Sequence, residues 1–473
     1  MMNFVAFSYD VLCMLKFHVT KCFKTNTTLN NFIRDLADEN EDVPFPYWII
    51  AAVATPFLLI VVIAIVIICV LRKKMKMERD KISDLLTSHP AALSVPSERP
   101  QTTVSTISQK FNSKEILIFL DGNSNMIDFT KEIIPQAAHI PSNPKREIPR
   151  SAFEIKGHLG SGNFGSVYKG EIKSHLKINS KIPVAIKSIK GLSGTQEIEN
   201  FLYEIKIMGY INPHFNLVNM AGFCKSDLET SGDLWLLIEF CDQGDLQSYV
   251  IKNKKNILSG KANNTINSRN LVLWTYHISK GMSYLASKFI MHGDLAARNI
   301  LLRKNPMDNG CSTAVIADFG LSKHLYADIT YTKENRLEIP WKWTALECLH
   351  TDYYTLKSDV WSFMVLIWEM FSFGKSPYGR WSYDDVLEKL LGGYRLPCPE
   401  ELKTIKTWSP EELYNKLSNT CFAAEPNDRG SFSDVVEVLE NEITKEELSN
   451  YIQENHKYQS TNLESFSRLS IIN

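Results

Sequence analysis

Two short stretches of the sequence carry residue types that could transfer a phosphate group. The stretch MHGDLAARNIL, residues 291–301, supplies Asp294 and, five positions later, Asn299. The stretch IADFG, residues 316–320, adds Asp318. A carboxylate can orient a hydroxyl group and accept its proton, whereas amide and carboxylate oxygens are ligands that Mg²⁺ prefers. The pattern indicates a hydroxyl group that attacks a phosphate held by magnesium.

A lysine and a glutamate upstream could hold the phosphates. Lys187 lies in the strand-like stretch PVAIKSIK, and Glu204 lies in the stretch TQEIENFLYEIKIMGYI, which has helical spacing. A lysine that faces phosphates needs a carboxylate to fix its ammonium group. Each residue alone is more simply a solvated surface charge, but together they predict an ion pair.

A glycine-rich stretch precedes this lysine. LGSGNFGSVYKG, residues 159–170, contains Gly160, Gly162 and Gly165, where a phosphate could approach the backbone N–H groups without meeting a Cβ atom. Dinucleotide-binding loops use a similar pattern, but there a helix follows, whereas strand-like residues follow here. The stretch predicts a hairpin that covers a nucleotide.

Taken together, these ordered motifs resemble the protein kinases, and more narrowly the receptor tyrosine kinases. The resemblance covers about the last two-thirds of the chain. Ala296, Ala297 and Arg298, between the aspartate and the asparagine, are similar to the tyrosine-specific form, and IPWKW, residues 339–343, is similar to the platform for a substrate tyrosine. The resemblance implies an α+β, bilobal protein kinase fold, with a small β-rich N-lobe carrying one regulatory helix and a larger helical C-lobe.

The resemblance also assigns roles to single residues. Asp294 would be the catalytic base, assisted by Lys187, Glu204 and Arg298, while Asn299 and Asp318 would bind Mg²⁺ or Mn²⁺. A larger set would bind ATP: Gly160, Ser161, Gly162, Asn163, Phe164, Gly165, Val167, Ala185, Lys187, Glu239, Phe240, Cys241 and Leu301.

Other residues are implied to regulate or brace the site. Tyr326 and Tyr331 stand where relatives phosphorylate themselves. Glu347 and Arg429 resemble a buried ion pair that fastens the activation segment to the large lobe. Asp359 resembles the carboxylate that holds the backbone of the catalytic loop.

One residue departs from the family pattern. Gly293 stands where most relatives have an arginine that grips a phosphorylated tyrosine of the activation loop. We expect an active enzyme whose loop depends less on phosphorylation, because every residue with a chemical role is present. The alternative is a catalytically weak or dead pseudokinase receptor that acts as a signalling scaffold. A soluble serine/threonine kinase is a third interpretation, against which the AAR sequence and an uncharged apolar run both argue.

Composition limits the other classes of function. The 473 residues exceed what one hydrophobic core usually organises, and the net charge of -1 gives no basic excess that would indicate nucleic-acid binding. The 9 cysteines lack paired metal-type spacing and are interpreted as reduced thiols.

An apolar run predicts how the chain is anchored. Residues 47–71 are uncharged and long enough for one transmembrane helix, and the basic RKKMK that follows places the C-terminal part in the cytoplasm. Residues 1–46 would be a short extracellular segment whose start resembles a poor signal peptide, and Asn26 is a glycosylation candidate. The expected location is the plasma membrane. This layout is similar to the short-ectodomain receptor kinases expanded in nematodes.

The remaining boundaries follow from composition. Residues 72–148 are rich in Ser, Thr, Pro and Asn and predict a juxtamembrane linker, residues 149–447 form the tyrosine kinase domain, and residues 448–473 form a polar C-terminal tail. The expected partners are the lipid bilayer, protein substrates with tyrosine, a second copy of the chain for trans-phosphorylation, and phosphotyrosine-binding adaptors at Tyr451 and Tyr458.

Overall fold

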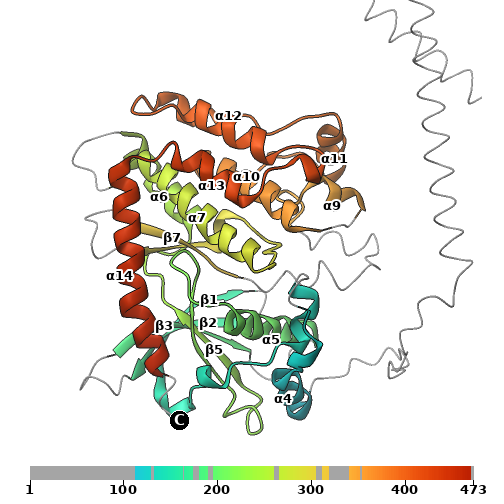
Figure 1. The fold of residues 1–473 in the computed structure, drawn as a ribbon, viewed down its shortest axis with the longest axis vertical. Coiled ribbons are helices and arrows are strands. Elements are labelled where there is room, and N and C mark those ends of the chain that lie inside the picture. The colour runs from blue at the N-terminus through green and yellow to red at the C-terminus, as the bar shows by residue number, and fades with distance from the viewer. Residues whose placement is uncertain are drawn as a thin grey trace, which may run out of the picture. The chain divides into compact units, whose positions relative to one another are not determined.

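The computed structural model describes residues 112–128, 133–162, 165–173, 181–189, 195–259, 266–304, 312–318, 340–351 and 354–469. Within them, the bilobal α+β fold expected from the sequence is confirmed (Figure 1). No helix of these described residues is both long and apolar enough to cross a bilayer. The expected span at 47–71 and the segment 1–46 with Asn26 lie outside the described residues, and both stay predictions.

The small lobe is an antiparallel sheet with the order β1-β2-β3-β5-β4. Its strands are β1 (Phe153–Gly162), β2 (Gly165–Lys173), β3 (Lys181–Ile189), β4 (Met220–Cys224) and β5 (Leu234–Glu239). Every residue of β4 and β5 is buried. Helix α5 (Thr195–Tyr210) packs its apolar face on this lobe, so the strand that carries Lys187 and the helix that carries Glu204 share one core.

The large lobe surrounds a buried central helix. Its helices are α6 (Leu246–Ser259), α7 (Arg269–Ser287), α9 (Leu346–Thr351), α10 (Leu356–Phe371), α11 (Tyr383–Leu391), α12 (Pro410–Cys421) and α13 (Phe432–Glu440). Short 3-10 turns are η5 (Ala297–Asn299), η8 (Glu400–Thr404) and η9 (Pro426–Asp428), and β6 (Ile300–Lys304) pairs with β7 (Ser312–Ile316). A capping box of Thr355 and Ser358 begins α10, which is apolar on nearly every face because neighbouring helices cover it.

Part of the segment expected to be a linker is packed structure. Helix α4 (Ser113–Asp121) begins with a capping box of Asn112 and Glu115 and buries Ile116 and Leu120. Short 3-10 turns follow: η1 (Ser124–Met126), η2 (Ile134–His139), η3 (Pro144–Arg146) and η4 (Arg150–Ala152). Phe119 of α4 meets Tyr203 of α5 edge to face, with ring centroids 5.2 Å apart. The segment therefore supports the helix that carries Glu204.

Lys206, which lies at this contact, lowers the stability of the folded chain. Its side chain is fully buried, its ammonium group lies 4.1 Å from the centre of the Phe119 ring, and it donates to the carbonyl of Ala138 over 2.7 Å. Burial lowers its pKa from 10.5 to about 8, although Asp121 acts in the opposite direction. An ammonium group in this place opposes folding at neutral pH.

We expect Lys206→Met to raise the free energy of unfolding at pH 7 by about 1–3 kcal/mol, because the removal of a buried charge outweighs the loss of its hydrogen bond to Ala138. The pKa of Lys206 is lower in the folded chain, so between about pH 8 and 10.5 the unfolded chain binds more protons, and native stability rises with pH. The stability advantage of Lys206→Met over the native chain should therefore largely vanish by about pH 10. Thermal unfolding of both chains at pH 7 and 10 measures it, and an equal gain at both pH values would contradict the assignment.

The C-terminal tail is also structured. Helix α14 (Lys445–Leu469) runs along the side of both lobes, from α13 toward the sheet (Figure 1). It buries Tyr451 and Tyr458, which are only 6% and 8% exposed. Tyr451 and Tyr458, which were expected in a polar tail, are therefore buried. Their burial is possible because their hydroxyl groups find hydrogen-bond partners on the kinase domain.

Candidate active site

Lys187 joins two carboxylates between the lobes. Its Nζ atom lies 2.5 Å from Oε1 of Glu204 on α5 and 3.3 Å from Oδ1 of Asp318, which follows β7. Burial alone would lower the pKa of Lys187, but the charges of Glu204 and Asp318 outweigh it and raise this pKa. The lysine is therefore a cation held in place, as a phosphate-binding group must be.

Asp294 lies at the centre of a second polar group. Its carboxylate accepts hydrogen bonds from Arg298 and, over 2.7 Å, from Nδ2 of Asn299. Asn299 also donates to the Asp294 carbonyl over 2.8 Å, and its own carbonyl accepts from the N–H of Ala317 over 2.9 Å. Asp294, Asn299 and the residue before Asp318 are thereby joined by hydrogen bonds.

Two acidic residues of α10 accept hydrogen bonds from the backbone of the loop that contains Asp294. Asp359 accepts the N–H groups of His292 over 2.7 Å and Gly293 over 3.0 Å. Glu369, which was not among the residues singled out from the sequence, accepts from the N–H of Ala297 over 2.9 Å and the indole N–H of Trp343 over 3.0 Å. In the sequence, the only signal for the role of Glu369 is an acidic residue within the apolar stretch 360–371. Each carboxylate fixes the backbone next to Asp294.

The residues assigned to the nucleotide come from both lobes. Val167 and Ala185 lie on β2 and β3, and Leu301 lies on β6. Glu239 ends β5, and residues 240 and 241 connect it to the large lobe, where the N–H of Gln243 donates to the carbonyl of Leu302 over 3.1 Å. Sequence spacing alone could not show that β6 is tied to this connection.

The glycine-rich hairpin is described in part. Gly160 and Gly162 end β1, and Gly165 begins β2 with a φ of +119°. A Cβ atom at Gly165 would lie 2.3 Å from the carbonyl oxygen of Ser188, so only glycine fits there. Asn163 and Phe164, the side chain of Ser161, and the loop with Tyr326 and Tyr331 lie outside the described residues, and their roles stay predictions.

A model of the protein tyrosine and serine/threonine kinase family matches residues 153–439. The chain belongs to this family. It is 30% identical over 386 residues to fibroblast growth factor receptor 1 of Xenopus laevis, an alignment that covers 80% of this chain and 45% of that receptor.

Two other relatives are also receptors. The chain is 31% identical to the tyrosine kinase receptor Cad96Ca of Drosophila melanogaster over 62% of this chain and 36% of that protein. It is 30% identical to vascular endothelial growth factor receptor 3 of Coturnix coturnix over 69% of this chain and 26% of the receptor. The chain thus spans less than half the length of these relatives. Its kinase domain is similar to those of receptor tyrosine kinases.

Members of the kinase family generally use ATP with a divalent metal ion, and the residues here fit such an ion. Asn299 turns its amide nitrogen toward Asp294, which leaves its amide oxygen for a cation, and Asp318 offers a carboxylate. In the described part of the chain, no group of three or more His, Cys, Asp or Glu side chains could hold a metal. Mg²⁺ usually binds proteins through only one or two carboxylates, and phosphate oxygens and water would complete its coordination.

Gly293 occupies a backbone conformation that suits glycine. Its φ is +78°, in the left-handed region. Its N–H still donates to Asp359, so the loop keeps its anchor without the usual arginine side chain. The departure removes a cation from this surface of the kinase domain and leaves the contacts of Asp294 in place.

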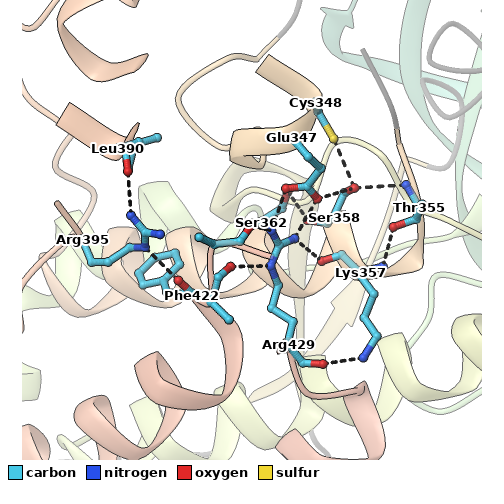
Figure 2. A network of polar contacts seen from close by, with 12 residues as sticks. Glu347, Cys348, Thr355, Lys357, Ser358, Ser362, Leu390, Arg395, Phe422 and Arg429 are labelled. Carbon is cyan, nitrogen blue, oxygen red and sulfur yellow. Dashed lines mark hydrogen bonds and ion pairs between the residues drawn. The ribbon is translucent and has the colours of Figure 1, made fainter. Parts of the chain in front are cut away.

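The buried ion pair implied by the sequence braces the segment before α10 (Figure 2). Nη1 and Nη2 of Arg429 donate to the two carboxylate oxygens of Glu347 over 2.8 and 2.6 Å. Three backbone carbonyls, of Ala423, Ala424 and Lys357, accept from the same guanidinium group over 2.9–3.2 Å. All five donors are used, which a buried arginine requires.

Proposed function

We propose that this chain is a catalytically active receptor-type protein tyrosine kinase that transfers the γ-phosphate of ATP to tyrosine hydroxyls, including its own. The observation that carries the proposal is the bridge from Lys187 to both Glu204 and Asp318, close to an Asp294 that Arg298 and Asn299 hold in place. A protein kept only as a scaffold has no need to align these groups.

In the proposed reaction, each residue acts from the position described above. Lys187 binds the phosphate oxygens of ATP, and Asp294 orients the tyrosine hydroxyl and accepts its proton. Mg²⁺, when bound at Asn299 and Asp318, supplies positive charge that balances the charge on the phosphates. Arg298 supports specificity for tyrosine, because its guanidinium group lies 4.7 Å from the centre of the Trp343 ring, next to the proposed phenol platform.

The proposal extends to regulation and location. Without an arginine at Gly293, phosphate on Tyr326 or Tyr331 has no guanidinium partner there, so activity depends less on loop phosphorylation. The apolar run at 47–71 and the relatives' names support a single-pass protein of the plasma membrane, with a glycosylated short ectodomain and a cytoplasmic kinase domain. This layout is similar to that of the nematode-expanded group. Self-association would allow trans-phosphorylation.

The test is direct. The full-length chain, incubated with Mg²⁺ and ATP, should acquire phosphotyrosine, whereas a Lys187→Met chain should acquire at least about 100-fold less. Mass spectrometry then identifies the modified residues. Equal signals from the two chains, or none from either, would favour the pseudokinase scaffold.

A further inference from the structure

Tyr458 of α14 is inserted into a polar cluster at the connection between the lobes. Its hydroxyl group donates to Oε2 of Glu239 over 2.8 Å and accepts from Nδ2 of Asn219 over 2.6 Å. The other carboxylate oxygen of Glu239 lies 2.5 Å from Nη1 of Arg303, and the guanidinium group of Arg303 lies 4.1 Å from the centre of the Tyr458 ring. The phenol therefore closes a cluster made by β5, β6 and the segment before β4.

Two further residues, Tyr451 and Glu447, attach α14 to the rest of the kinase domain. Tyr451 donates to Oδ1 of Asn216 over 2.7 Å and stacks on His277 of α7 with centroids 5.5 Å apart. At the start of the helix, Glu447 pairs with Arg269 over 2.7 Å. Little of the rest of the helix is apolar, and Ile452 points outward with 57% exposure. Among residues 445–460, whose side chains the structure describes, a few residues on one face therefore hold α14 in place.

A phosphate group cannot be accommodated where the Tyr458 hydroxyl lies. Both of its hydrogen-bond partners are within 2.8 Å, and one of them is the carboxylate of Glu239. Phosphotyrosine adds a charge of about -2 at neutral pH, so it would overlap these atoms and place more negative charge beside Glu239, whose charge Arg303 already balances. The pKa of Tyr458 is raised by burial and by Glu239, so the hydroxyl stays protonated and donates.

We propose that Tyr458 is a latent phosphorylation site: docked α14 hides it from tyrosine kinases, and its phosphorylation prevents α14 from docking again. In the transfer, the phenol oxygen bonds to the γ-phosphorus of ATP, the bond to the β,γ-bridging oxygen breaks, and ADP leaves. The phenol proton passes to the catalytic aspartate of the transferring kinase. The released segment then presents phosphotyrosine to a phosphotyrosine-binding module.

The experiment compares rates of phosphorylation at Tyr458. The full-length chain and a synthetic peptide of residues 445–469 are each treated with ATP, Mg²⁺ and an added tyrosine kinase of broad specificity. Tyr458 in the chain should react at least about tenfold more slowly than in the peptide, because reaction requires local opening of α14. Tyr451→Ala, which removes a second docking residue, should bring the rate within about threefold of the peptide. Ile452→Ala is the matched control on the exposed face and should react like the native chain.

Hydrogen exchange gives a second measurement that does not depend on a variant. After phosphorylation of Tyr458 in the native chain, the amides of α14 should exchange rapidly while those of α7 stay protected. A native chain that reacts as fast as the peptide, or a phosphorylated chain whose α14 stays protected, would overturn the proposal. Because an added kinase transfers the phosphate, this result does not depend on the proposed activity of the chain itself. Parallel reactions without the added kinase measure that activity.

Discussion

Asp294→Asn is expected to lower the turnover number for tyrosine phosphorylation about 1000-fold, while ATP binds almost as before. The amide can fill the same space and hydrogen-bond to Arg298 or Asn299, but it cannot accept a proton from the substrate hydroxyl. Rates at saturating ATP and a binding assay with an ATP analogue measure the two effects. Asp384→Asn, an exposed aspartate of α11, is the control and should have no effect on either.

The pH profile gives an independent check on the same residue. Burial raises the pKa of Asp294, although Arg298, His292 and Asn299 act in the opposite direction. A base must be deprotonated to work, so activity should fall as the pH drops through this raised pKa, at a higher pH than an ordinary aspartate would give. A turnover number of the Asp294→Asn variant within about tenfold of the native value would show that another group accepts the proton.

Much of this site could be predicted because its parts are local. Asp294 and Asn299 are separated by five positions in one tight loop, so the sequence alone places their side chains together. Lys187 and Glu204 lie on one strand and the next helix, which share a core in the structure. The loop with Tyr326 and Tyr331 offers no such local determinant in its sequence, and the roles of these tyrosines stay predictions.

The two segments that flank the kinase domain, which contain α4 and α14, were harder to interpret because their partners lie far away in the sequence. Tyr458 binds Glu239 across 219 positions, and the polar composition of the tail favoured a solvated segment. A local signal was present in both segments. Asn112 with Glu115, and Thr444 with Glu447, form capping boxes at the starts of α4 and α14. Such a box predicts that a helix begins there but not which surface it will cover.

The largest expected loss of stability comes from Arg429→Leu, which should lower the free energy of unfolding by about 3–5 kcal/mol. The leucine would leave the carboxylate of Glu347 and three backbone carbonyls without their donor in the interior of the large lobe (Figure 2). An uncompensated buried charge is far more costly than the modest net gain from a single hydrogen bond. Thermal or urea unfolding of the full-length chain measures the loss.

Arg395→Leu tests the contacts of a guanidinium group that has no carboxylate among its hydrogen-bond partners here, and Arg395 is partly buried whereas Arg429 is buried. Arg395 lies 4.9 Å from the centre of the Trp361 ring, as Arg429 lies 5.1 Å from it, and it donates to the carbonyls of Phe422, Leu390 and Tyr394. None of these contacts is with a carboxylate, so its loss should be about 1–2 kcal/mol. Equal losses for the two variants would mean that Glu347 contributes little and that stacking and backbone hydrogen bonds stabilise this corner. A larger loss for Arg429 is expected from the Glu347 pair together with the deeper burial of Arg429.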